Sequence, residues 1–106
     1  MNNIFDLKAI DFSNNEEIVE ILTQRKNIRI ERIISSGQIS LGDFWYDQAE
    51  YEFVIVLQGE AKIVFENREE QFLRQGDYLI IPPHEKHRVS YTSINPICIW
   101  LTVFYN

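Results

Sequence analysis

The sequence has very little cysteine and no surplus of basic residues. Cys98 is its only cysteine, so no disulfide can form within the chain. Ten Lys and Arg residues stand against 16 Asp and Glu residues, which gives a formal net charge of -6. Proteins that follow the phosphate backbone of nucleic acid need a basic surface, and so do proteins that bind anionic membranes. We therefore expect no nucleic acid and no membrane among its partners.

Long hydrophobic runs are missing as well. No apolar stretch approaches the roughly 20 residues that cross a bilayer. The start MNNIFDLKAIDF has neither the basic flank nor the apolar core of a signal peptide. These features predict a soluble, cytoplasmic protein. With 106 residues, of which 45% are hydrophobic and 25% charged, the chain has the size and composition of one globular domain, residues 1–106.

The N-terminal part carries the signals of one short helix. Ser13 and Glu16 have the spacing of a capping box, in which each side chain bonds the other residue's backbone N–H. Ile18, Ile21 and Leu22 follow at helical intervals. The pattern predicts a helical segment over residues 14–26.

From residue 28 onward, short runs of β-branched and aromatic residues alternate with Gly, Asn, Asp and Pro, which is typical of strands and turns. The runs are IRIERII, DFWYDQ, YEFVIVLQ, AKIVFE, EQFLR, DYLIIP, HRVSY and ICIWLTVFY. Gly59 and Asn67 each separate two runs and predict a tight hairpin at each position. So many strands without a second helix predict an all-β fold, an antiparallel sandwich or small barrel.

Two spaced motifs occur within this part of the chain. Glu52 is followed after six residues by Gly59, and Gly76 is followed after five residues by Pro82, with His87 four residues further on. These spacings resemble the two signature motifs of the cupin family, over residues 42–91. The resemblance implies an antiparallel double-sheet jelly-roll barrel over residues 28–106. In that family, three histidines and a glutamate from the motifs hold one divalent metal inside the barrel.

The first motif is degenerate compared with that family. The positions of the family's histidine pair fall on Tyr46 and Gln48 in one register, and on Trp45 and Asp47 in the other. Neither register supplies a histidine. In the second motif, His84 stands where the family has a turn glycine. Since His84 follows two prolines within the turn, we expect it at the surface.

The alternation of side chains along a strand helps to choose between the registers. Tyr46, Gln48 and Glu52 share a parity and therefore a face, which Asp47 joins only if a bulge intervenes. We therefore favour Tyr46, Gln48, Glu52 and His87 as a cluster that points into the barrel, and Asp47 stays open as a replacement for Gln48.

Two functions of different class follow from this cluster. In the first, Gln48, Glu52 and His87 hold Mn, Fe or Zn, and Tyr46 or Glu52 moves a proton on a small polar substrate. The family resemblance then implies an isomerase, lyase, decarboxylase or dioxygenase. In the second, the barrel binds a small polar or anionic molecule without turnover and without metal. Glu52 would then be paired structurally, with Arg32 or His87.

The run YEFVIVLQ is apolar at alternate residues on both faces, whereas a lone barrel should leave one face of each strand wet. Something must cover the outer face. We expect a homodimer formed through sheet contacts, and the N-terminal segment is the competing cover.

Overall fold

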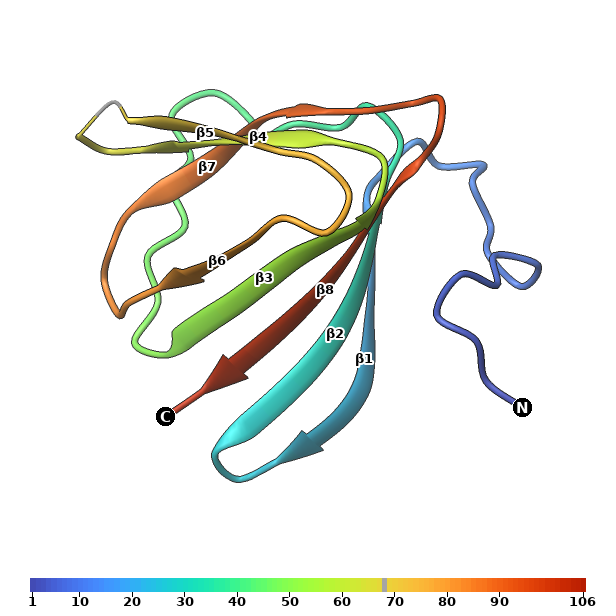
Figure 1. The fold of residues 1–106 in the computed structure, drawn as a ribbon, viewed down its shortest axis with the longest axis horizontal. Helices are drawn as coiled ribbons and strands as arrows, with labels where there is room; N and C mark the ends of the chain where they lie inside the picture. Colours follow the sequence, from blue (N-terminus) through green and yellow to red (C-terminus); the bar gives the residue numbers. More distant parts are fainter. Residues whose placement is uncertain (68) are drawn as a thin grey trace.

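The computed structural model describes residues 1–67 and 69–106. Within them it contains eight strands and no helix: β1 (Ile18–Arg25), β2 (Ile28–Ser35), β3 (Tyr51–Gln58), β4 (Ala61–Phe65), β5 (Glu70–Leu73), β6 (Tyr78–Ile81), β7 (His87–Thr92) and β8 (Cys98–Tyr105). One sheet has the order β1-β2-β8-β3-β6 and the other β5-β4-β7 (Figure 1). All strand pairs are antiparallel, so the prediction of an all-β antiparallel fold is confirmed.

The predicted helix over residues 14–26 is wrong. Most of this segment is β1, an edge strand that pairs along its length with β2. The capping box does not form either, since the backbone N–H of Glu16 donates to Asn14 Oδ1 at 3.3 Å. Among the described residues there is accordingly no helix long and apolar enough to cross a membrane.

The run DFWYDQ is not a strand but part of the connection from β2 to β3. An isolated bridge joins Tyr46 of this run to His87, and in it each backbone N–H donates to the other's carbonyl, at 2.7 and 3.1 Å. This bridge fixes the connection against the start of β7. The other seven expected strands are present as β2 to β8.

The turn at Gly59 differs from the expected hairpin, because β3 and β4 belong to different sheets. The chain crosses here from one layer to the other. Gly59 has φ +80°, and a Cβ at this position would lie 2.4 Å from Ser93 Oγ. No larger residue fits this corner without displacing a neighbour. The hairpin expected at Asn67 does join two paired strands, β4 and β5, although its residue 68 lies outside the described residues.

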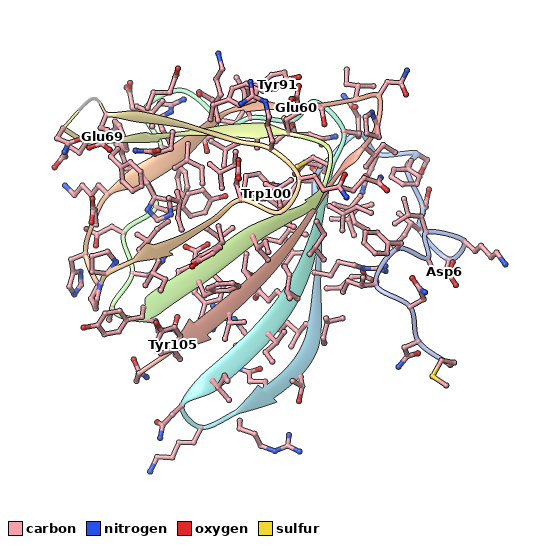
Figure 2. All side chains as sticks on the ribbon, in the orientation of Figure 1. Asp6, Glu60, Glu69, Tyr91, Trp100 and Tyr105 are labelled. Atoms are coloured by element: carbon pink, nitrogen blue, oxygen red, sulfur yellow. The ribbon has the colours of Figure 1, made fainter. Side chains whose placement is uncertain are left out.

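The hydrophobic core fills the space between the two sheets. Figure 2 shows Trp100 in this space, where its Nε1 donates to Ser35 Oγ at 3.1 Å. The buried cluster comprises Val54, Val56, Ala61, Ile63, Phe65, Leu73, Ile81, Cys98 and Trp100. Towards the start of β3 and β7 the apolar filling gives way to polar side chains, and these line a cavity.

Candidate functional site

The inner cavity, as we call the space of about 130 Å³ lined by Glu52, His87 and Thr102, lies between the two sheets. Strands β1, β2, β3 and β8 line it from the five-stranded sheet, and β4 and β7 from the three-stranded sheet. The connection before β3 adds two side chains. The polar lining residues are Glu17, Glu31, Tyr46, Gln48, Glu52, His87 and Thr102.

Glu52 is at the centre of a short polar chain. Gln48 Nε2 donates to Glu52 Oε1 at 2.9 Å, and His87 Nε2 lies 3.4 Å from the same oxygen. Glu52 and His87 are 8% and 4% exposed, so both are withdrawn from bulk water. The structure therefore brings together three residues that lie up to 39 positions apart in the sequence.

The tautomer of His87 follows from its second ring nitrogen. His87 Nδ1 lies 2.9 Å from the carbonyl oxygen of Glu85, and a carbonyl only accepts, so Nδ1 carries a proton. Nε2 is left to face Glu52. Burial lowers the pKa of His87, but the hydrogen bonds to Glu52 and to the Glu85 carbonyl, together with the charge of Glu52, outweigh burial and raise the pKa overall. The protonated form of His87 is therefore stabilised in this position relative to a free imidazole.

Tyr46 covers the imidazole on one side. Its ring stacks on that of His87, with centroids 5.4 Å apart and an angle of 24° between the planes. Burial and the charges of Glu17 and Glu52 raise the pKa of Tyr46 to about 12. Its hydroxyl therefore stays protonated at neutral pH and is suited to donate a hydrogen bond rather than to act as a base.

Three polar lining residues were not found from the sequence. Glu31 on β2 accepts from Arg29 Nε at 2.8 Å, and Glu17 accepts from Ser35 Oγ at 3.5 Å. Burial raises the pKa of Glu17, the hydrogen bond from Ser35 lowers it, and the charge of Glu31 raises it again, with a net rise. Thr102 on β8 is 1% exposed. The pairing of β2 with β8 places Thr102 opposite Glu31, and the pairing of β1 with β2 brings in Glu17, which directly precedes β1.

Asp47 and His84 form a separate pair outside the cavity. His84 Nδ1 lies 2.8 Å from Asp47 Oδ1, and the two side chains are 69% and 39% exposed. His84 thus lies at the surface, as expected. Arg32 also lies elsewhere, since its Nε donates to Glu20 Oε1 at 2.5 Å. His87, and not Arg32, is the partner of Glu52.

The donor set of the inner cavity fits a divalent metal poorly. Gln48 directs its amide nitrogen, which is not a ligand, at Glu52, and Nε2 of His87 faces the same carboxylate oxygen. Of the three predicted ligands, one imidazole and one carboxylate remain, and these two already contact each other. Glu17 and Glu31 also line the cavity, but Glu31 accepts from Arg29 and Glu17 accepts from Ser35. Within residues 1–67 and 69–106, no three His, Cys, Asp or Glu side chains are grouped so as to hold a metal ion.

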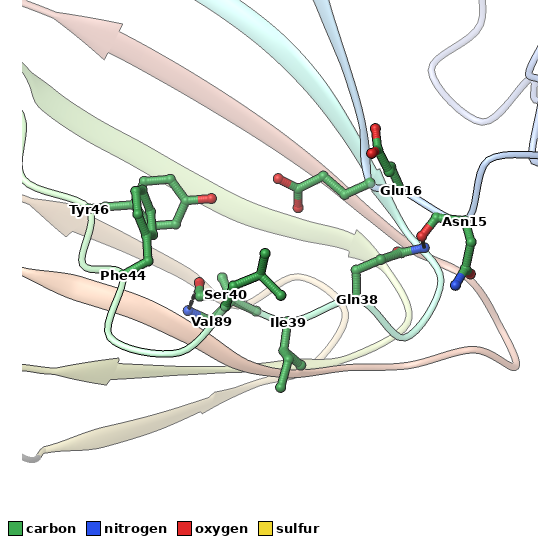
Figure 3. Close-up of a pocket in the computed structure, with 10 residues that line it drawn as sticks. Asn15, Glu16, Gln38, Ile39, Ser40, Phe44, Tyr46 and Val89 are labelled. Carbon is green, nitrogen blue, oxygen red and sulfur yellow. Dashed lines mark hydrogen bonds between the residues drawn. The ribbon is translucent and has the colours of Figure 1, made fainter.

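A wider outer hollow of about 440 Å³ adjoins the inner cavity, and Glu17, Tyr46 and Val89 line both. Figure 3 shows Tyr46 and Phe44 at one end of this hollow and Gln38 and Asn15 at the other.

Comparison with known proteins gives one family model and several similar solved structures. The family model described as Cupin domain matches residues 32–104. The crystal structure of a "putative mannose-6-phosphate isomerase" from Ralstonia eutropha has a TM-score of 0.90 and 37% sequence identity, over 100% of this chain and 97% of that one. A cupin superfamily protein from Desulfitobacterium hafniense gives 0.73 and 21%, over 86% of this chain and 78% of that one.

A third similar structure is an RmlC-like cupin family protein with a double-stranded β-helix fold from Methanocaldococcus jannaschii. Its TM-score is 0.72 at 17% identity, over 99% of this chain and 91% of that one. No curated protein matches the chain.

Proposed function

This chain belongs to the cupin family, and from that premise we propose that it binds a small polar molecule in the inner cavity and moves a proton on it with Glu52 and His87. The observation that carries the proposal is the buried contact of 3.4 Å between Glu52 Oε1 and His87 Nε2 at the cavity wall. Such a pair supplies a base and an acid at one place, which is what proton-transfer catalysis requires.

Aldose–ketose isomerisation is the reaction that this pair suits best. A base removes the proton from the carbon next to the carbonyl, and an acid protonates the carbonyl oxygen. The base then gives its proton to the carbon that carried the carbonyl, and the hydroxyl on the neighbouring carbon gives its proton back to the acid, so nothing is consumed. Glu52 would take the carbon-bound proton, and the imidazolium of His87 would protonate the oxygen. Tyr46, whose hydroxyl stays protonated, would donate a hydrogen bond to the same oxygen.

The relative from Ralstonia eutropha supports this reaction class, since it is described as an isomerase of a sugar phosphate and shares 37% of its residues over the whole chain. The further structures are less than 25% identical and support the fold alone. The proposal takes from the first relative the class of reaction and not its phosphorylated substrate.

Cupins commonly bind divalent metals, and a Mn, Fe or Zn ion on Gln48, Glu52 and His87 stays a prediction. Because the donor set fits such an ion poorly, no step of the proposed reaction passes through it. A metal would withdraw the Glu52 carboxylate from proton transfer, so the two roles of Glu52 exclude each other.

Exchange of carbon-bound hydrogen tests the proposal directly. The protein, dialysed against EDTA, is incubated in D2O with aldoses and ketoses, free and phosphorylated, and deuterium beside the carbonyl is measured by NMR. We expect exchange on at least one sugar, reduced by at least about 100-fold in Glu52→Gln. His84→Ala, which changes the exposed histidine, should exchange at the wild-type rate.

Other outcomes contradict the proposal. Exchange that appears only after Mn or Zn is added back would overturn the metal-free mechanism and support the metal prediction. Sugar binding without any exchange would favour the second function, a binding module without turnover. One observation favours this second function: Tyr46 and Gln48 stand where the family has its histidine pair.

A further inference from the structure

We propose that the inner cavity selects an uncharged, polyhydroxylated molecule, a free sugar or polyol, and discriminates against phosphorylated sugars and cations. This inference rests on the proposed function, because it names the class of substrate on which Glu52 and His87 would act. It is carried by two independent observations, the pairing of the charges around the cavity and a buried hydroxyl without a partner.

Two of the three carboxylates that line the cavity are paired with Arg29 or His87, and the third, Glu17, accepts a hydrogen bond from Ser35 Oγ. Glu31 accepts from Arg29 Nε at 2.8 Å, and Glu52 lies 3.4 Å from His87 Nε2. Arg29 itself is further held by Glu50 at 3.4 Å and over the ring of Phe104 at 4.3 Å. Paired carboxylates have little net field to attract a cation, yet their other lone pairs still accept hydrogen bonds from hydroxyl groups.

A phosphate would find no partner inside the cavity. None of the described residues that line it is a Lys or Arg. Phosphate recognition relies on such side chains or on the N-terminus of a helix, and the described part of the chain has no helix. Glu17, Glu31 and Glu52 would instead face a phosphate with carboxylate oxygens, which costs free energy in a site removed from water.

Thr102 shows where a ligand hydroxyl would bind. Its side chain lines the cavity at 1% exposure, and Oγ1 has no hydrogen-bond partner among the described residues. A buried polar group without a partner destabilises a protein unless something bonds it. Thr102 lies opposite Glu31 across the β2–β8 pair. If one hydroxyl of a ligand bonds to Thr102, the Glu31 carboxylate is therefore placed to accept a hydrogen bond from the next hydroxyl of the same ligand.

The walls suit the apolar face of a sugar ring. Trp100 and Phe104 lie on either side of Thr102 along β8, and all three line the cavity. Aromatic rings beside hydroxyl and carboxylate groups offer both the stacking surface and the hydrogen bonds that a polyol presents.

Three sugars that share one ring and differ in a single charged substituent test the inference. D-mannose, D-mannosamine and D-mannose 6-phosphate are titrated into the wild-type protein, as are the corresponding derivatives of D-glucose, with binding followed by NMR. We expect a neutral sugar to bind at least about tenfold more tightly than its charged derivatives. Preference for the phosphate or the amine, or no binding of either neutral sugar at about 10 mM, would overturn the inference.

Thr102→Val separates a ligand contact from a structural hydroxyl, and Ser90→Ala is the matched control. Ser90 Oγ is also buried without a partner, but Ser90 does not line the cavity. Both variants should raise the thermal midpoint, because each removes an unpaired hydroxyl. Thr102→Val alone should weaken neutral-sugar binding, by about tenfold. Unchanged binding in Thr102→Val would contradict the proposed contact.

The two proposals fail separately. If the protein binds neutral sugars and exchanges no deuterium, the reaction is refuted and the ligand class stands. If it exchanges deuterium on mannose 6-phosphate and binds this sugar best, the ligand class is refuted and the reaction stands.

Discussion

At the scale of single residues, the proposed function depends on the contact between His87 and Glu52. The carbonyl of Glu85 fixes the tautomer of His87, and Gln48 holds the Glu52 carboxylate in place with a bond of 2.9 Å. Tyr46 covers the imidazole and keeps its own proton. In the proposed reaction, proton transfer therefore belongs to Glu52 and His87, and Gln48 is a positioning residue.

The sequence predicted these four residues and not the other half of the site. Motif spacing and strand parity point to Tyr46, Gln48, Glu52 and His87, because both are properties of the linear chain. Thr102 has no such signal, since it is one polar residue in the apolar run ICIWLTVFY. Its position opposite Glu31 depends on which strands pair, and strand pairing is a long-range property that spacing within one strand does not contain.

At the scale of elements, β1 shows why the predicted helix failed. Apolar residues at 18, 19, 21 and 22 satisfy the helical interval and also suit a strand, and Ile18, Val19 and Ile21 are β-branched. Pairing with β2 favours the strand over the helix. Without β1, the backbone N–H and C=O groups on one side of β2 would form an unpaired sheet edge. The misassignment also hid Glu17, which precedes β1 and lines the cavity.

Arg32 connects β1, β2 and the N-terminal segment. Its Nε donates to Glu20 Oε1 on β1, and its Nη1 donates to the carbonyl oxygens of Ile4 and Asp6, at 3.0 and 2.7 Å. The Arg32 side chain is 10% exposed. The N-terminal segment is thus held on the outer face of the five-stranded sheet by a buried guanidinium.

Replacing Arg32 with Met should release this segment and keep the apolar stem of the side chain. We expect faster amide hydrogen exchange in residues 4–10, measured by mass spectrometry, and a loss of about 1–3 kcal/mol in the free energy of unfolding. Arg25→Met is the control, since Arg25 is exposed and donates to the carbonyl of the neighbouring Gln24. Unchanged exchange in Arg32→Met would show that packing alone holds the segment.

At the scale of the whole molecule, the outer face of the five-stranded sheet is apolar at the end away from the N-terminal segment. In the strand register Arg32 lies opposite Leu101, and Leu101 lies opposite Ile55. Residues opposite each other share a face of the sheet, so the N-terminal segment held by Arg32 and the apolar end lie on the same outer face. Figure 1 shows the N-terminal segment beside β1, with β6 at the opposite edge of the sheet. Tyr78 and Ile80 on β6 are 60% and 57% exposed.

This uncovered end supports the homodimer, which stays a prediction. Burial of the β3–β6 surface against a second copy would remove the exposed apolar side chains from water. Light scattering should give twice the chain mass of 12.6 kDa at micromolar concentration. Ile80→Lys should shift the protein towards the monomer. Ile94→Lys, at a 68% exposed apolar residue between β7 and β8, should leave the dimer intact. A wild-type monomer would refute the prediction.

The central claim is that Glu52 and His87 form a proton-sharing pair, and NMR titration of the histidine ring protons tests it most directly. His84 and His87 are the only histidines, so His84→Ala identifies the His87 signal without further assignment. We expect His87 to titrate above its ordinary pKa of 6.5, because burial, which lowers the pKa, is outweighed by Glu52 and Glu85 together, whose hydrogen bonds and charges stabilise the imidazolium. In Glu52→Gln, where burial remains and the charge is lost, the pKa should fall. A His87 that titrates below 6.5 in the wild type, or at the same pH in both proteins, would contradict the account.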